Sequence, residues 1–153
     1  MKVLDVNLLL YAVNEESPHH ASAKSWLERC LSEAESVALP WVVILGFLRL
    51  ATSPRVFPAP LDPSQALAVV DGWLARPAVV PLSPGREHWR ILKDLVQEAG
   101  TAGNLTTDAH LAALAVEHGA ELHSTDTDFA RFAKLRWVNL LQAWRDDRSP
   151  SQG

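Results

Sequence analysis

Three aspartates lie where the sequence predicts that a strand ends or a helix begins. Asp5 closes an apolar segment at the N-terminus, and Asp108 lies in the first turn of a helix predicted over residues 107–117. Asp126 follows a strand predicted over residues 121–124. Clustered carboxylates repel one another, and a cation relieves that repulsion. Because all-oxygen ligands suit Mg²⁺ or Mn²⁺, the pattern indicates a metal site that can act on phosphate esters.

Each of these acids also has an ordinary structural role open to it. Asp5 can cap the helix that follows it, and Asp108 is favoured in a first helical turn by the helix dipole alone. Asp128, two residues after Asp126, can hold a turn before Phe129. The joint pattern, and no single member of it, indicates the metal site.

The elements that position these acids follow from apolar periodicity and capping residues. Strands are predicted over residues 2–5, 36–39, 79–82, 121–124 and 136–139. Helices are predicted over residues 7–13, 18–33, 41–51, 63–75, 84–99 and 107–117. Ser17 is expected to cap the second helix and Thr106 the last. Strands that alternate with helices predict an α/β fold with a parallel sheet covered on both faces, and sites in such sheets form outside the carboxyl ends of the strands.

Composition narrows the class of protein. A chain of 153 residues, 48% of them hydrophobic, suits one folded domain, and a single cysteine excludes an internal disulfide framework. The N-terminal segment carries Asp5 and Asn7 and has neither a signal-peptide pattern nor a spanning length, so we expect a cytoplasmic protein. The net charge of −4 is unusual for a nucleic-acid binder, although bound metal ions would add local positive charge.

Three stretches of the sequence together resemble a known family. They are LDVNLLLYA, TTDAHLAALAVEHGAEL and STDTDFARF, and they are similar to the signatures of PIN-domain ribonucleases of the VapC type, the toxins of VapBC toxin–antitoxin pairs. The segment LPWVVILGFLRLATSPRVFP is similar to one branch of those toxins, and the resemblance extends over residues 3–141. It implies a three-layer α/β fold and a Mg²⁺- or Mn²⁺-dependent endoribonuclease.

The resemblance also implies roles for individual residues. Three acids would bind metal and carry catalysis: Asp5, Asp108 and Asp126. Three neighbours would support them: Asp128, Thr125, as the hydroxyl of the T-x-D motif, and Asn7.

One position departs from the family pattern. PIN domains usually carry a glutamate in the third helix, and here Gly46 occupies that place in LGFLRLAT. No acid occurs between Val37 and Leu61, so a shifted alignment does not supply one. One carboxylate fewer would weaken metal binding. Gly46 either allows close helix packing or opens the pocket to substrate.

The resemblance further implies partners and a domain boundary. RNA would be the substrate, a VapB-type antitoxin would place an Arg or Lys near the acids, and the toxin would form a homodimer. The antitoxin is expected to cover exposed apolar side chains, with Trp41, Phe47 and Leu50 as candidates. Residues 1–144 would form the PIN domain, and residues 145–153 would form a flexible polar tail. No part of the chain is expected to enter a membrane.

Three other functions remain open from the sequence. The first is a PIN fold that, without the glutamate, binds RNA or an antitoxin and does not cut. A haloacid-dehalogenase-like phosphatase would need an acid where Asn7 stands, and a suitable lysine, whereas none lies between Lys24 and Lys93. A response-regulator receiver would need an acidic pair near the first strand.

Overall fold

The fold is a parallel sheet with helices on both faces. The computed structural model describes residues 1–148, and within them the sheet has the strand order β3-β2-β1-β4-β5, with every pair of neighbours parallel. The strands are β1 (Lys2–Leu4), β2 (Val37–Pro40), β3 (Val79–Leu82), β4 (Glu121–His123) and β5 (Trp137–Val138). The predicted α/β class and all five predicted strands are therefore confirmed.

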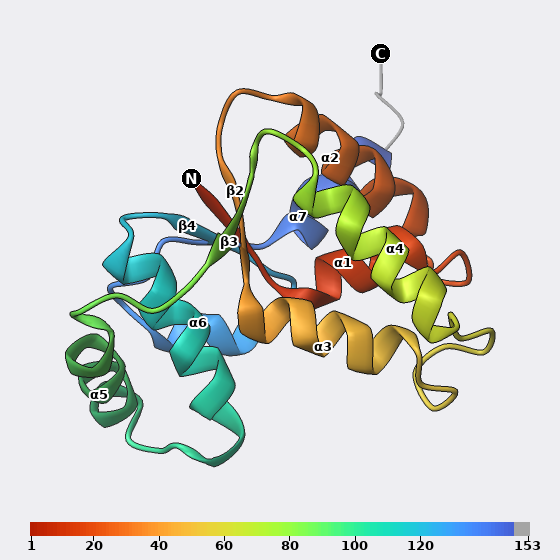
Figure 1. Cartoon of the computed structure of the whole chain (residues 1–153). Helices are drawn as coiled ribbons and strands as arrows, with labels where there is room; N and C mark the ends of the chain where they lie inside the picture. The colour runs from red at the N-terminus through yellow and green to blue at the C-terminus, as the bar shows by residue number, and fades with distance from the viewer. Residues whose placement is uncertain (149–153) are drawn as a thin grey trace.

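The helices lie on the two sides of this sheet. They are α1 (Val6–Val13), α2 (His20–Ser32), α3 (Trp41–Ala51), α4 (Pro63–Leu74), α5 (His88–Ala99), α6 (Thr106–Glu117) and α7 (Leu140–Arg148). Two 3-10 turns, η1 (Gly103–Leu105) and η2 (Thr127–Arg131), precede α6 and β5. Figure 1 shows α5 and α6 on one side of the sheet and α1, α2 and α4 on the other. No helix in residues 1–148 is both long and apolar enough to span a bilayer.

The central strands form because their side chains are apolar on both faces. Val3 and Leu4 of β1 are fully buried, and every residue of β2 is buried. This is the composition expected for a parallel strand covered by helices on both sides. β1 lies between β2 and β4, with Leu4 opposite His123, and the Asp5 backbone N–H donates to the His123 carbonyl at 3.0 Å. The carboxyl ends of β1 and β4 therefore lie side by side.

Two helices begin later than the sequence predicts, because tertiary or turn contacts use the first residues, and α6 begins one residue earlier, at Thr106. The Ser17 hydroxyl accepts the His19 N–H at 3.1 Å and closes a turn, so α2 starts at His20. The Glu117 carboxylate accepts the backbone N–H groups of Gly85 and Glu87, at 2.7 and 2.9 Å, so α5 starts at His88 and not at residue 84. In α6 the expected cap is itself the first helical residue, and Leu105 occupies the capping position with no side-chain bond.

Other predictions of local structure agree with the structure. α3 has the predicted bounds, and α4 opens with the predicted capping box between Asp62 and Gln65. The sequence analysis missed α7, whose Trp144 is buried in the core. The predicted start of the tail, Arg145, falls inside α7, and the rest of that tail beyond Arg148 lies outside the described residues.

Candidate metal centre

Asp5 lies at the junction between β1 and α1, and the fold holds both of its carboxylate oxygens. Oδ1 accepts the Val6 N–H at 2.7 Å, so Asp5 is the N-cap of α1. Oδ2 accepts the Ser124 hydroxyl, also at 2.7 Å. The side chain is 6% exposed. Capping and membership of the acidic site are therefore compatible roles of one carboxylate.

Ser124 joins three parts of the site, and the sequence analysis missed it. Besides donating to Asp5, its buried hydroxyl accepts Asn7 Nδ2 at 3.1 Å and the Asp126 backbone N–H at 3.0 Å. Thr125, the hydroxyl residue named in the sequence analysis, makes no hydrogen bond within the described part of the chain. A signal for Ser124 was present, because a polar residue at the end of a buried apolar strand needs a hydrogen-bond partner.

Asn7 lies beside Asp5 as expected. Its Nδ2 donates to Asp5 Oδ2 at 3.4 Å and to Ser124 Oγ at 3.1 Å. Its Oδ1 is buried and has no hydrogen-bond partner among the described residues. The pocket therefore contains an acceptor oxygen that the protein itself does not use.

Three further carboxylates gather next to Asp5. Asp108 comes from the first turn of α6, and Asp126 caps η2, where its Oδ1 accepts the Asp128 N–H at 2.9 Å. One carboxylate oxygen from each of Asp108, Asp126 and Asp128 lies within 4.8 Å of the other two. Asp128, predicted as a supporting residue, is thus a full member of the closest group, whereas Asp5 stands next to it.

The electrostatics of this group favour a bound cation. The pKa of Asp108 is raised to about 6, chiefly by burial and in addition by the negative charges of Asp126, Asp5 and Asp128. Burial also raises the pKa of Asp5, against the hydrogen bonds from Ser124 and Val6, which lower it. Ionisation is therefore disfavoured at two of the four clustered carboxylates, Asp108 and Asp5. Together with the unpaired amide oxygen of Asn7, the carboxylates form a donor set that suits Mg²⁺ or Mn²⁺.

Gly46 lies on α3 opposite the start of α1. A Cβ atom built on Gly46 would lie 3.6 Å from Cγ2 of Val6, the residue that follows Asp5. Gly46 also lines a cavity of about 300 Å³ together with Val6 and Thr107, and Thr107 precedes Asp108. The helix that lacks an acid therefore runs beside the two segments that supply Asp5 and Asp108.

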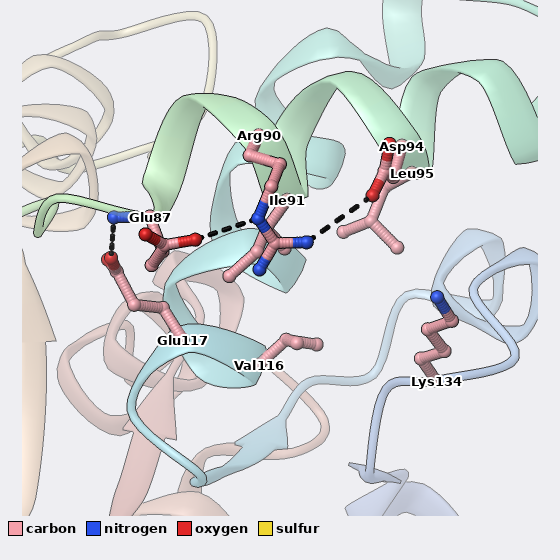
Figure 2. Close-up of a pocket in the computed structure, with 8 residues that line it drawn as sticks. All are labelled: Glu87, Arg90, Ile91, Asp94, Leu95, Val116, Glu117 and Lys134. Atoms are coloured by element: carbon pink, nitrogen blue, oxygen red, sulfur yellow. Dashed lines mark hydrogen bonds and ion pairs between the residues drawn. The ribbon is translucent and has the colours of Figure 1, made fainter.

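A larger hollow, of about 380 Å³, lies between α5 and the end of α6, and Figure 2 shows its lining. Its charges are largely paired with each other: Arg90 Nε lies 2.7 Å from Glu87, and Arg90 Nη1 lies 3.7 Å from Asp94. Glu117 is engaged by backbone N–H groups at the start of α5. The hollow is lined by none of the four aspartates of the acidic site, so its size does not make it the functional centre.

Known proteins are similar to this chain in sequence over most of its length. The family model described as "PIN domain" matches residues 2–135. Ribonuclease VapC37 of Mycobacterium tuberculosis is 48% identical over 137 residues, which cover 90% of this chain and 95% of the relative. Ribonuclease VapC33 of the same species is 45% identical over 142 residues, covering 93% of this chain and 99% of the relative.

Solved structures share the fold at low sequence identity. VapBC2 from Rickettsia felis, bound to a DNA fragment from its promoter, has a TM-score of 0.65 at 19% identity, covering 90% of this chain and 97% of the other. FitAcB from Neisseria gonorrhoeae has a TM-score of 0.63 at 17% identity, covering 91% and 97%.

Proposed function

The chain belongs to the PIN domain family, alongside the VapC ribonucleases, and on that premise we propose that it is a metal-dependent endoribonuclease and the toxin of a toxin–antitoxin pair. The observation that carries the proposal is the group of carboxylates at the carboxyl ends of β1 and β4. Family membership also sets aside the phosphatase and receiver alternatives.

Each side chain of the site would have a distinct role in binding metal or in positioning a carboxylate. Asp108, Asp126 and Asp128 would hold Mg²⁺ or Mn²⁺, with Asp5 beside them and Asn7 Oδ1 as a further oxygen. When bound there, the ion supplies Lewis-acid chemistry that makes water a better nucleophile and offsets charge on the phosphate. Ser124 orients Asp5 and fixes the backbone at Asp126, so that the carboxylates keep their positions despite their mutual repulsion.

The ribonuclease proposal is tested with RNA and purified protein. We expect cleavage with Mg²⁺ or Mn²⁺, none in excess chelator, and a loss of at least about 100-fold in Asp5→Asn and Asp126→Asn, since metal-site changes typically cost 10- to 100-fold or more. Asp71→Asn is the matched control, because Asp71 is exposed on α4 away from the site. Cleavage that persists in chelator, or that survives in both site variants, would contradict the proposal.

Gly46 supports one alternative within the same fold. In this alternative the site, without a carboxylate from α3, binds RNA and does not cut it, although four acids still meet there. The chelator experiment separates the two functions when it is combined with an RNA-binding measurement. Binding without cleavage at any metal concentration would favour the binding protein.

We also infer a VapB-type antitoxin as the protein partner, since solved relatives of this fold are toxin–antitoxin complexes. An Arg or Lys of the antitoxin would offset the carboxylates as a metal does. Trp41 is 48% exposed and available for contact, as predicted, whereas Phe47 is fully buried against Trp73 and cannot take part. Leu45, 62% exposed one turn after Trp41, takes its place in the proposed surface.

The homodimer, the cytoplasmic location and the flexible tail stay predictions from the sequence. Analytical ultracentrifugation of the purified chain, alone and with its antitoxin, tests whether the chain forms a homodimer. A free chain that sediments as a monomer at all concentrations would contradict it.

A further inference from the structure

α3 has two apolar faces, and only one of them serves the core. The face toward the core carries the four buried residues of the helix: Val43, Ile44, Phe47 and Ala51. The other face carries residues at helical spacing that line a cavity: Val42, Leu45, Gly46, Arg49 and Leu50. A helix that is apolar on most sides is either buried or covers a binding partner. Leu45 on this second face is 62% exposed, so the face is open to contact from outside the chain.

The cavity on this face adjoins the acidic site. Its volume is about 300 Å³, at the lower end of the range for small-ligand pockets, roughly 300–1,000 Å³. Val6 and Thr107 close it on the side of the site, and each is bonded in sequence to one of the acids, Asp5 and Asp108. A molecule whose phosphate reached the carboxylate-bound metal would bring its neighbouring group to this cavity.

Gly46 creates the room. No side chain projects from α3 at this point, and an added Cβ would meet Val6 at 3.6 Å, which is ordinary contact. The position therefore tolerates a small side chain, so close packing does not by itself require glycine. A longer side chain at Gly46 would occupy the cavity.

The polar groups of the cavity suit one kind of occupant. Arg49 lines it and has no ion pair with any described residue, in a chain whose net charge is −4. Thr107 is exposed, and its hydroxyl makes no hydrogen bond within residues 1–148. Apolar walls accept the face of a nucleobase, a hydroxyl can bond to its edge, and a free guanidinium can bind the next phosphate.

We propose that the cavity over Gly46 is a subsite for one nucleobase of the RNA strand, next to the phosphate that is cut, and that Arg49 binds the phosphate on its outer side. The inference rests on the proposed ribonuclease function and adds a substrate contact to it. The position that would carry an acid in related domains thus serves substrate binding in this chain.

The first test uses RNA that lacks single bases. Cleavage is mapped on a short single-stranded RNA, and each nucleotide around the cut is then replaced by an abasic one. We expect one abasic position next to the cut to raise KM about tenfold, because the abasic nucleotide loses the apolar contact of its base with the cavity walls. The experiment uses the unchanged protein, so it does not depend on a variant that folds. Equal KM values for all abasic substrates would overturn the proposal.

The second test fills the cavity. Gly46→Leu should bind intact RNA about tenfold more weakly and should no longer distinguish intact from abasic RNA, whereas Gly46→Ala should keep that distinction. Gly72→Leu is the control, because Gly72 lies in α4 with nothing within 4 Å of an added Cβ. Binding is measured by fluorescence anisotropy with Ca²⁺ in place of Mg²⁺. A Gly46→Leu protein that still prefers intact RNA would overturn the subsite.

The third test concerns Arg49. Arg49→Ala should reduce the slope of log Kd against log salt concentration by about 0.7, the value for one phosphate contact on a single strand. Lys24→Ala, an exposed cation on α2, should leave the slope unchanged. An unchanged slope in Arg49→Ala would contradict the proposed contact between Arg49 and a phosphate. If the unchanged protein binds RNA in this base-dependent way but never cuts it, the ribonuclease proposal fails, and the cavity is a nucleobase site with no cut phosphate beside it. If the protein binds no RNA, both proposals fail.

Discussion

Ser124 links two acids of the site that lie far apart in the sequence, Asp5 and Asp126. Its hydroxyl bonds to Asp5, Asn7 and the Asp126 backbone, and all of these groups are buried or partly buried. Removing it leaves several polar groups unsatisfied, which costs about 1–3 kcal/mol for each buried group. The effect would reach both the stability of the fold and the placement of two acids.

We therefore expect Ser124→Ala to lower the free energy of unfolding by about 2 kcal/mol and kcat for RNA by at least about tenfold. Thr125→Ala, one residue along and without a hydrogen bond in the described chain, should change both by far less. Denaturant unfolding and single-turnover cleavage measure the two quantities. Equal effects of the two variants would mean that Ser124 does not organise the site.

Asp108 makes the stability of the metal-free protein depend on pH. Its pKa is raised to about 6, above the ordinary aspartate value of 3.8, so the folded protein binds a proton more tightly than the unfolded chain does. Between about pH 4 and 6 the stability contributed by this group therefore falls as pH rises. The melting temperature of the metal-free protein should therefore drop between about pH 4 and 6, and it should drop less in Asp108→Asn. Identical pH profiles of the two proteins would contradict this prediction.

Gly46→Glu would return an acid to α3. The new carboxylate should lower the melting temperature without metal, through repulsion, even though glutamate gains about 1 kcal/mol over glycine in helix propensity. It should then gain a larger melting shift than the unchanged protein when Mn²⁺ is added, because binding to the native state alone stabilises it. The measurement is melting temperature against Mn²⁺ concentration. Equal shifts would mean that the Gly46 position does not reach the metal site.

Elements whose bounds depend on local sequence were predictable, and those set by distant contacts were not. Apolar runs gave the five strands, and α3 begins at once after Pro40 as predicted. The start of α5 was misplaced because the Glu117 carboxylate, from another helix, holds the residues before it in a turn. For the same reason, the acids of the site were identified while the hydroxyl that orients them was not: Ser124 acquires its role only when β4 lies beside β1.

The contact between Glu117 and the start of α5 can be tested by mutation. Glu117→Ala should lower the free energy of unfolding by about 1 kcal/mol, a modest value because its two acceptor bonds are exposed to water. RNA cleavage should stay unchanged, since Glu117 lies at the opposite end of α6 from Asp108. Hydrogen exchange should increase in residues 85–88. A loss of cleavage in a protein that remains folded would show that the start of α5 takes part in function.

For the whole molecule, an acidic chain that handles RNA needs a local source of positive charge. The net charge of −4 repels a polyanion, and the four aspartates add to that repulsion where the phosphate must approach. In the proposed site, a bound metal ion and the guanidinium of Arg49 would counter this repulsion. Net charge alone would have argued against RNA as the substrate, because it averages over a surface on which the two signs are unevenly distributed.

The bond between Asp5 and Ser124 joins residues separated by 119 positions in the sequence. During synthesis Asp5 leaves the ribosome 119 residues before Ser124, and Asp126 follows Ser124. Because the hydrogen bond needs both residues, a chain that stops before Ser124 has no assembled centre. In the proposed toxin, nuclease activity would therefore begin only after the residues that follow β4 have been translated and β4 has paired with β1.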